Sequence, residues 1–469
     1  MDNFYCKASF SAMRHSSMEV RMDYQALSKE FVLHALRREK SVIFERAEGS
    51  RLWDIDGKMY LDTMSGSAGP AMVGHANPVV AEAVARQMAK LPTVNLLHDS
   101  VPVIEFCQKL ASITPEGLTK TFLCVGGGEA VEAAIKFAMR ITGRAEVLSL
   151  TGAYHGQSLA TMGLGGMPAL RKWLPGAVRW PNFRQVPSGD AYRPLLGETP
   201  DHWSAAVHAL EADLSAGSSG HVAALILELV QGPNGHSVYP REYYEAVQRV
   251  CRERGVLLIV DEIQTGLCRC GSNWASDLYR VTPDILVAGK ALGGGVPIGA
   301  FITRKDLIPD GLETEAWHML TFMNQPLAAA AGLAVLEIAE KERLAERARK
   351  LGAQATERFR DLAERYEVIG DIRGPGLFIG VDFVEDRKTK TPATAACKKA
   401  WDFAMDRGLI AQFGGFGSNV LKFKPPLTTP VGDFEQMLDI CEEVVAFIQR
   451  EVQGSGRTQA ANVPAGVRG

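Results

Sequence analysis

Short apolar runs alternate with helical patterns through the middle of the chain, and this rhythm constrains the fold more than any other feature. The runs TFLCV, AEVLSL, AALILELV, VLLIVDE, DILVAG and IGAFIT indicate buried strands. Helical patterns such as Glu129–Thr142 and Glu242–Arg254 lie between them. Strands that alternate with helices form a mainly parallel sheet with helices on both faces. The sequence therefore predicts an α/β fold with one large domain of this kind.

The two ends of the chain carry different patterns. Residues 41–62 alternate in polarity and turn at EGS and DG, which predicts short antiparallel strands. From about Asn324 the pattern becomes helical, with helices expected over Pro326–Lys341, Leu344–Glu367 and Phe434–Gln453. The runs LFIGVDFV and VLKFKPP indicate further strands between these helices. We expect a smaller α+β domain built from both chain ends.

This organisation predicts five segments along the chain. They are an N-terminal segment and helix (1–40), the N-terminal part of the small domain (41–75), the large domain (76–330), the C-terminal part of the small domain (331–453) and a disordered tail (454–469).

Composition and charge exclude several classes of protein. Of the 469 residues, 46% are hydrophobic and 22% are charged, as in an ordinary globular protein. The formal net charge is −3, so no overall field attracts nucleic acid or an anionic membrane. The chain has no apolar run long enough to span a bilayer, and its N-terminus lacks the apolar core of a secretory signal. We expect a cytoplasmic protein with neither nucleic acid nor membrane as partner.

The eight cysteines do not indicate a disulfide framework in a chain of this length. Cys268 and Cys270 form the one close pair, and two ligands at this spacing would need two more nearby. We therefore predict no metal site.

A glycine-rich turn follows the strand TFLCV. Gly126, Gly127 and Gly128 precede a helix that begins near Glu129. Bare backbone amides at the N-terminus of a helix bind anions, and a phosphate suits them well. The turn matches neither a P-loop nor the GxGxxG fingerprint, so it is also compatible with a simple turn.

Two further strand ends carry charged residues. VLLIV ends in Asp261, which could simply cap the following turn. DILVAG ends in Lys290, 29 residues later (290 − 261), and a solvated surface lysine is its simplest alternative. The glycines after Lys290 disfavour that alternative, because a lysine in solvent gains nothing from neighbouring residues that lack side chains. The spacing fits one strand–helix–strand crossover, so both side chains should meet at the carboxyl edge of the sheet.

A phosphate cradle, a buried acid and a strand-end lysine together describe a site for pyridoxal phosphate. Lys290 would form a Schiff base with the cofactor aldehyde, because desolvation favours its neutral amine. Asp261 would pair with the pyridine nitrogen and keep it protonated, so that the ring accepts electrons. Tyr154, in the segment AYHG, could stack on the ring. Ordinary strand-end packing is an equally good reading of Tyr154 and His155.

Four longer segments carry a resemblance to a known family. LILELVQGPNG, VLLIVDEIQTGLCRCG, PDILVAGKALGGGVPIGA and GDIRGPGLFIGVDF resemble the class III pyridoxal-phosphate-dependent aminotransferases. The resemblance runs from about Ser41 to about Phe447, and the register also resembles the dialkylglycine decarboxylase branch. It implies fold type I of the pyridoxal-phosphate-dependent transferases, with residues 76–330 as the cofactor-binding domain.

The resemblance implies a role for each residue that matches a family motif. Lys290 and Asp261 are the catalytic pair, as the Schiff-base lysine and the partner of the pyridine nitrogen. The other implied cofactor contacts are Gly127 and Gly128 at the phosphate, Tyr154 and His155 at the ring face, Gln264 at the ring hydroxyl, and Thr321, which reaches the phosphate from the neighbouring subunit. A homodimer with active sites at its interface follows from Thr321.

The resemblance also implies two substrate-binding residues. Arg373 matches the arginine that grips a substrate carboxylate, where a guanidinium makes a bidentate contact. Glu228 matches a family glutamate. It would pair with Arg373 while an amine without a carboxylate is bound, and release it when a carboxylate competes.

Some positions depart from the family pattern. Val125 stands where the phosphate turn usually has serine, so backbone amides must hold more of the phosphate. Leu229 follows Glu228 where proline is usual, and Ser67 stands where the decarboxylase branch has glutamine. These positions surround the substrate, so they bear on the reaction more than on the cofactor.

The leading prediction is an aminotransferase that moves an amino group between an amine or amino acid and a keto acid. A lyase, a racemase or epimerase, and a decarboxylase are alternatives on the same scaffold, since pocket geometry selects which bond breaks. A binding or sensor module without catalysis is a third reading. The presence of both Asp261 and Lys290 weighs against it.

Overall fold

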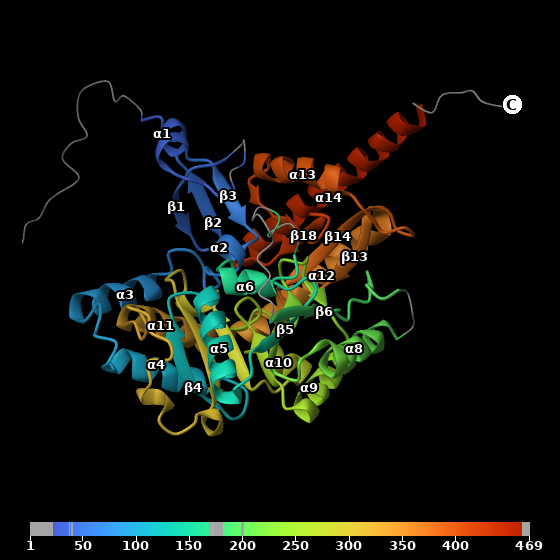
Figure 1. Cartoon of the computed structure of the whole chain (residues 1–469). Helices are drawn as coiled ribbons and strands as arrows, with labels where there is room; N and C mark the ends of the chain where they lie inside the picture. The colour runs from blue at the N-terminus through green and yellow to red at the C-terminus, as the bar shows by residue number, and fades with distance from the viewer. Residues whose placement is uncertain are drawn as a thin grey trace, which may run out of the picture.

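The chain folds around one large sheet, with smaller sheets above it in the view of Figure 1. The computed structural model describes residues 22–36, 38, 41–167, 170, 172, 182–197 and 201–461, and only the backbone of the last seven. The blue N-terminal strands and the orange and red C-terminal elements lie together in Figure 1, although they are far apart in the sequence. Among the described residues, no helix combines the length and the apolar character needed to cross a membrane.

The large sheet has seven strands in the order β4-β12-β11-β10-β7-β5-β6. Neighbours from β11 to β6 pair in parallel, whereas β12 runs antiparallel to both β11 and β4. The bounds are Leu118–Cys124 (β4), Glu146–Leu150 (β5), Phe183–Val186 (β6), Val222–Leu227 (β7), Leu257–Asp261 (β10), Ile285–Gly289 (β11) and Gly299–Arg304 (β12). All six apolar runs form strands here, which confirms the predicted α/β fold. The sequence did not predict strand β6. Two of its four residues, Arg184 and Gln185, are polar.

Helices cover both faces of this sheet. Ile285 and Val287 of β11 point to one face, where they join the core beneath α5 (Gly127–Thr142). Leu286 and Ala288 point to the other face and join the core that contains α11 (Pro326–Lys341). This alternation along one strand follows from the pleat, and it explains why β11 is apolar throughout.

The structure describes six further helices in this part of the chain. They are α3 (Pro78–Lys90), α4 (Val101–Ala111), α6 (Leu159–Leu164), α8 (His202–Ala212), α9 (Arg241–Arg254) and α10 (Ala275–Tyr279). Helices α3 and α4 pack on α11, α6 packs on α5, and α8 packs on α9. A short hairpin of β8 (Val230–Gln231) and β9 (Ser237–Val238) follows β7.

Strands from the two chain ends share one small sheet. Strands β1 (Phe44–Glu48), β2 (Arg51–Asp54) and β3 (Met59–Asp62) are antiparallel, and β16 (Leu409–Ile410) pairs with β3. An ion pair reinforces this junction, because the Arg51 guanidinium donates to both Asp433 oxygens at 2.9 and 2.6 Å. The prediction of antiparallel strands over residues 41–62 is confirmed.

A second small sheet lies entirely in the C-terminal part. It consists of β13 (Ile369–Arg373), β14 (Ile379–Asp386), β18 (Val420–Phe423) and β17 (Phe413–Gly414), with β15 (Thr391–Pro392) on β14. The helices of both ends are α1 (Tyr24–Phe31), α2 (Ser65–Ala68), α12 (Leu344–Arg365), α13 (Thr394–Asp406) and α14 (Val431–Ala461).

Two predicted boundaries differ from the elements of the structure. The final helix was expected to end at Gln453, but α14 continues to Ala461, so residues 454–461 are helical rather than a disordered tail. Residues 462–469 lie outside the described residues. The domain boundary predicted after residue 330 falls inside α11, which packs on α3 and α4 beside the large sheet. The division of the chain into domains otherwise stays a prediction.

One close backbone approach packs α12 against the turn between β13 and β14, and we predict that it tolerates no side chain. A Cβ added to Gly352 in α12 would lie 2.1 Å from the Gly376 carbonyl oxygen. Gly352→Ala should therefore destabilise the protein by about 1–3 kcal/mol, the usual range for overpacking. Thermal unfolding by calorimetry measures this as a lower Tm.

The matched control is Gly432→Ala at the start of α14, where an added Cβ meets no atom within 4 Å. Alanine favours a helix by up to about 1 kcal/mol over glycine, so this control should keep or raise the Tm. An unchanged Tm for Gly352→Ala would contradict the packing argument.

Candidate functional site

The candidate site lies where the parallel strands of the large sheet end. Asp261 is the last residue of β10, and Lys290 directly follows β11. Glu228 follows β7, and the segment with Tyr154 and His155 follows β5. Parallel register brings these ends to one edge of the sheet, since Asp261 pairs with Val287 two residues before the end of β11. The sheet therefore gathers residues from four separate segments.

Asp261 is held by a histidine. The His155 Nδ1 lies 2.8 Å from Asp261 Oδ2, and the backbone N–H of Ile263 donates to Asp261 Oδ1 at 3.1 Å. Burial lowers the pKa of His155, but the hydrogen bond to Asp261 and its charge outweigh burial and raise it above its ordinary value. His155 Nε2 is buried without a hydrogen-bond partner among the described residues. The two contacts fix the Asp261 carboxyl in a nearly solvent-free place.

Lys290 occupies a strained position with an amine that is easily deprotonated. Its φ is +44°, in the left-handed region that costs a non-glycine residue on the order of 1 kcal/mol. Burial lowers the pKa of the Lys290 amine, and the charges of Asp261 and Glu228 oppose this shift only in part. A neutral amine is a nucleophile, so the site favours bond formation to a carbonyl.

The glycines after Lys290 serve packing rather than access to a ligand. Gly294 has a φ of +58°, and a Cβ on it would lie 2.7 Å from a Val335 methyl group of α11. These glycines let the short 3-10 turn Lys290–Gly293 pack against α11, which fixes the backbone that carries the lysine.

The predicted phosphate turn forms the N-terminus of α5. Gly126 caps this helix without any side-chain hydrogen bond, so the first amides remain open to a ligand. A Cβ on Gly126 or Gly128 would meet no atom within 4 Å, which describes open space. Gly127 is packed instead, because a Cβ there would lie 2.8 Å from Ile263 Cδ1. Open amides, a buried carboxylate and a buried amine together fit the phosphate, ring nitrogen and aldehyde of pyridoxal phosphate.

Glu228 is buried inside this site, and few hydrogen bonds offset the cost of burying its carboxyl group. It is 5% exposed, and the backbone N–H of Tyr154 donates to its Oε2 at 2.9 Å. Burial raises the pKa of the Glu228 carboxyl to about 7, with His155 opposing and Asp261 supporting the shift. Glu228 therefore changes its charge near neutral pH.

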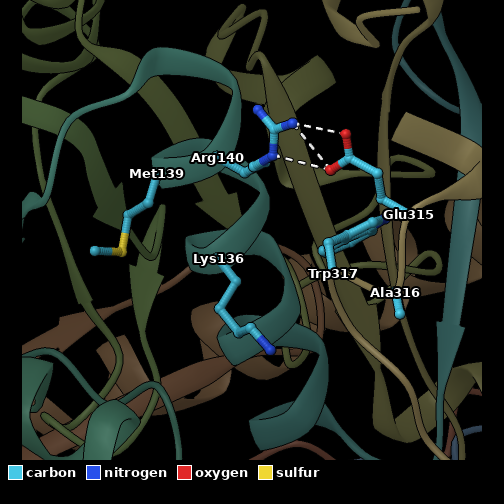
Figure 2. A pocket seen from close by; sticks show the side chains of 6 residues that line it. All are labelled: Lys136, Met139, Arg140, Glu315, Ala316 and Trp317. Atoms are coloured by element: carbon cyan, nitrogen blue, oxygen red, sulfur yellow. Dashed lines mark hydrogen bonds and ion pairs between the residues drawn. The ribbon is translucent and has the colours of Figure 1, made fainter. Parts of the chain in front are cut away.

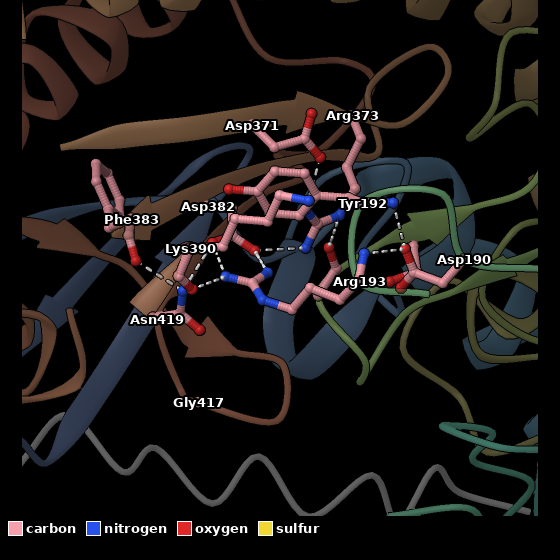
Figure 3. Close-up of polar contacts among 12 residues, drawn as sticks. Asp190, Tyr192, Arg193, Asp371, Arg373, Asp382, Phe383, Lys390, Gly417 and Asn419 are labelled. Atoms are coloured by element: carbon pink, nitrogen blue, oxygen red, sulfur yellow. Dashed lines mark hydrogen bonds and ion pairs between the residues drawn. The ribbon is translucent and has the colours of Figure 1, made fainter. Parts of the chain in front are cut away.

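Arg373 does not meet Glu228, although the resemblance led us to expect that pair. The Arg373 guanidinium donates to the Gly235 carbonyl, to Asp371 at 2.7 Å and to Asp382 at 3.0 Å (Figure 3). Two carboxylates already neutralise this cation within the C-terminal sheet. The expected grip on a substrate carboxylate would have to break these contacts first.

Two buried lysines were missed by the sequence analysis. Lys422 lies on β18 and Lys424 directly follows that strand, and both are buried. Lys424 Nζ donates to Gln264 Oε1 at 3.4 Å, so this strand reaches the residue predicted to contact the ring hydroxyl. The alternation in VLKFKPP was a usable signal, because residues two apart on a strand share a face. Lysines at this spacing in a buried strand point into one site.

Thr321 lies away from this cluster on an exposed turn. Met319 and Phe322 beside it are 61% and 54% exposed. The predicted contact of Thr321 with a neighbouring subunit therefore stays a prediction.

A separate groove runs between α5 and the segment that precedes Thr321. Figure 2 shows Lys136, Arg140 and Trp317 on its walls, with Arg140 bonded to Glu315. No residue of the candidate site lines this groove.

Comparison with known proteins places the chain in a family. The family model Aminotransferase class-III matches residues 35–445. Leucine/methionine racemase of Thermococcus litoralis is 35% identical over 414 residues, covering 87% of this chain and 91% of the racemase. A 5-aminovalerate aminotransferase of Pseudomonas aeruginosa is 34% identical over 412 residues, covering 86% and 93%. The solved structure of an amine transaminase from an uncultivated Pseudomonas species, in its PLP-bound form, has a TM-score of 0.82 and 30% identity, covering 88% of this chain and 98% of that one.

The matched region contains the whole sheet edge described above, from the glycine turn before α5 to Lys422 of β18 and Lys424 after it. The fold is that of the pyridoxal-phosphate-dependent transferases of fold type I, and the cofactor is pyridoxal phosphate. This chain belongs to the class III aminotransferase family.

Proposed function

We propose that this enzyme moves an amino group between an amine or amino acid and a keto acid, with Lys290 as the residue that bonds to the cofactor. The observation that supports it is the meeting of Lys290, Asp261 and the open amides before α5 at one sheet edge. Pyridoxal phosphate, when bound, supplies an aldehyde for amines and a protonated ring that accepts electrons from the substrate carbon.

The residues of the chain prepare this chemistry. The buried amine of Lys290 is nucleophilic, and after release it can carry a proton between two substrate atoms at Nζ. Asp261, fixed by His155, would hold a proton on the ring nitrogen. The remaining proposed contacts are Gly127 and Gly128 to the phosphate, Tyr154 and His155 to the ring face, and Gln264 to the ring hydroxyl.

We propose Lys422, rather than Arg373, as the partner of the substrate carboxylate. Arg373 is bonded to two aspartates, whereas Lys422 makes no ion pair with a described residue. Burial and the charge of Lys290 together lower the pKa of Lys422 to about 8, and the charge of Glu228 opposes the shift. The charges of Lys290 and Glu228 thus both act on the Lys422 amine. The proposed pairing of Glu228 is therefore with Lys422, when the bound amine has no carboxylate.

We also propose a homodimer with active sites at the interface. The exposed apolar side chains of Met319 and Phe322 beside Thr321 support it, because an interface would cover them. A cytoplasmic location stays a prediction from the sequence.

Racemisation is the second candidate, because the family relative from Thermococcus litoralis is a racemase. A transaminase consumes its amino donor only when a keto acid is present, whereas a racemase inverts the donor without one. We expect the purified holoenzyme to convert donor and keto acid in a one-to-one ratio. Chiral chromatography after incubation with and without keto acid measures this. Inversion, ammonia or CO₂ formation without a keto acid would contradict the transaminase function.

Borohydride reduction of the holoenzyme should fix the cofactor permanently on Lys290. The reason is that Lys290 combines an amine of lowered pKa with a position at the sheet edge beside Asp261. Peptide mapping by mass spectrometry locates the added pyridoxyl mass, and Lys290→Ala should carry none. A label on another lysine in the wild-type protein would reject the assignment.

The affinity for a keto acid should depend on the protonation of Lys422. Below about pH 8 the ammonium is present and binds the carboxylate, whereas above it the neutral amine does not. We expect the KM for the keto acid to rise roughly tenfold per pH unit above that value. Lys422→Met should raise the KM roughly 10–100-fold at neutral pH, as for loss of a charged hydrogen bond. Steady-state kinetics across pH measures both effects.

The matched control is Lys422→Arg, because a guanidinium stays charged throughout this range. It should bind the keto acid with a KM that no longer rises above pH 8. A pH profile identical to that of the wild type would show that another group controls binding. A large loss in Arg373→Lys with no loss in Lys422→Met would restore Arg373 as the carboxylate partner.

A further inference from the structure

The backbone of Lys424, directly after β18, is held on both sides by the N-terminal part of the chain. Its N–H donates to the Thr63 carbonyl oxygen at 2.9 Å, and its own carbonyl oxygen accepts from the Ser65 hydroxyl at 2.8 Å. The residue is 1% exposed. Its side chain therefore starts from a fixed point inside the protein.

The Lys424 amine has one hydrogen-bond partner among the residues that the structure describes. Nζ donates to Gln264 Oε1 at 3.4 Å, which is a long hydrogen bond, and lies 5.5 Å from the centre of the Phe378 ring. Burial lowers the pKa of Lys424 well below its ordinary value, and the positive charges of Lys422 and Lys290 lower it further. A neutral amine needs no anion beside it, and it still donates a hydrogen to an amide oxygen.

A second contact fixes the same amide oxygen. A Cβ built on Gly232, which follows β8, would lie 1.9 Å from Gln264 Oε1 and 3.2 Å from the Phe378 ring. The oxygen therefore occupies the place where any other residue at position 232 would carry its side chain. It faces the Cα hydrogens of Gly232, a contact that suits a weak acceptor and repels an amide N–H group. Lys424 and Gly232 thus both select the oxygen of this amide on their side.

With its oxygen held, the Gln264 amide presents its nitrogen on the opposite side. Among the described residues, no atom accepts a hydrogen bond from Gln264 Nε2. Gln264 lies in the turn that follows Asp261, so this donor belongs to the sheet edge where the cofactor ring is proposed to bind. An amide nitrogen with two unused hydrogens suits an oxygen that carries negative charge.

We propose that Lys424 is a positioning residue that turns the Gln264 amide, so that the amide nitrogen donates to the ring hydroxyl oxygen of the cofactor and stabilises its anionic form. This inference rests on the proposed function, in which Gln264 contacts the ring hydroxyl. A reversed amide would place its own oxygen there and repel the anion. The orientation of one amide thus decides at which pH the bound cofactor changes its protonation.

A space-filling role explains the position of Lys424 less well. A methionine side chain nearly matches the lysine stem in length, and it would fill this place without the free-energy cost of burying an amine. The bonds to Thr63 and Ser65 use only the main chain of residue 424, so they do not depend on the amine. Lys424→Met therefore removes the amine and leaves the anchored backbone in place.

The pH titration of the cofactor absorbance in the holoenzyme tests the proposal. A donor to the ring oxygen favours the anion, so loss of that donor raises the midpoint of the titration. Gln264→Leu should raise the midpoint by about 1 pH unit, as for loss of a hydrogen bond to a charged group. Lys424→Met should raise it by at least about 0.5 pH unit, because the amide is then free to reverse.

A double-mutant cycle shows whether Lys424 acts through Gln264. In the Gln264→Leu background, Lys424→Met should add less than about 0.3 pH unit, since the amide that it orients is already gone. A shift that persists there at full size would mean a direct effect of the amine on the cofactor and would overturn the proposal. Lys399→Met is the matched control, because this lysine pairs with Glu451 and its side chain is 63% exposed. It should leave the midpoint unchanged.

Gly232→Ala disturbs the same amide without changing Lys424. Its Cβ would displace Gln264 Oε1 and should raise the midpoint in the same direction as Lys424→Met. This variant decides if Lys424→Met does not fold or does not hold the cofactor. An unchanged midpoint in Lys424→Met, or in Gly232→Ala if the lysine variant does not fold, would overturn the proposal while Gln264→Leu still shifts.

Failure of the proposed function looks different from failure of this inference. An unchanged midpoint in Gln264→Leu would remove the contact of Gln264 with the ring hydroxyl, and the role of Lys424 with it. A protein that is not a transaminase would transfer no amino group to any keto acid, whereas its titration shifts would remain.

Discussion

The free-energy cost of burying charged groups governs this site. Asp261 and Glu228 are buried at the same sheet edge as the half-buried Lys290, and their partners differ. His155 and a backbone N–H contact the Asp261 carboxyl directly. Glu228 has one backbone donor, and burial raises the pKa of its carboxyl to about 7. Lys290 has no bonded partner among the described residues, and burial lowers the pKa of its amine. One sheet edge thus holds a carboxyl fixed by two contacts, a group that titrates near neutrality and an amine of lowered pKa.

Close backbone contacts keep these groups in register. A Cβ on Gly299 of β12 would lie 2.3 Å from the Gly126 carbonyl oxygen, so β12 reaches the phosphate turn directly. A Cβ on Gly376, between β13 and β14, would lie 2.8 Å from the Arg269 carbonyl oxygen, so the C-terminal sheet closely approaches the segment that follows β10. Lys424, which follows β18, contacts Gln264 of that same segment. Two parts of the chain therefore meet at the site through close backbone packing.

The two cationic residues of the C-terminal sheet show how environment decides the use of a charge. Arg373 lies between Asp371 and Asp382, and its guanidinium completes a structural network with Arg193 and Asn419 (Figure 3). Lys422 lies on the same sheet without a carboxylate partner among the described residues. The bonded cation stabilises the sheet, while the unpaired one remains available to a ligand.

The sequence by itself determined the large sheet, since apolar strands and amphipathic helices alternate with unambiguous periods. It also determined the cofactor, because Asp261, Lys290 and the glycine turn each stand at the end of a predicted strand, and parallel strands must meet at one edge. Strand β6 was not predicted, since tertiary packing rather than apolar pattern holds FRQV in the sheet. The tertiary structure alone decided which cations have a carboxylate partner. A motif fixes where a side chain sits along the chain, but partners such as Asp382 come from another strand, and only the folded arrangement pairs them with Arg373 and leaves Lys422 and Lys424 unpaired.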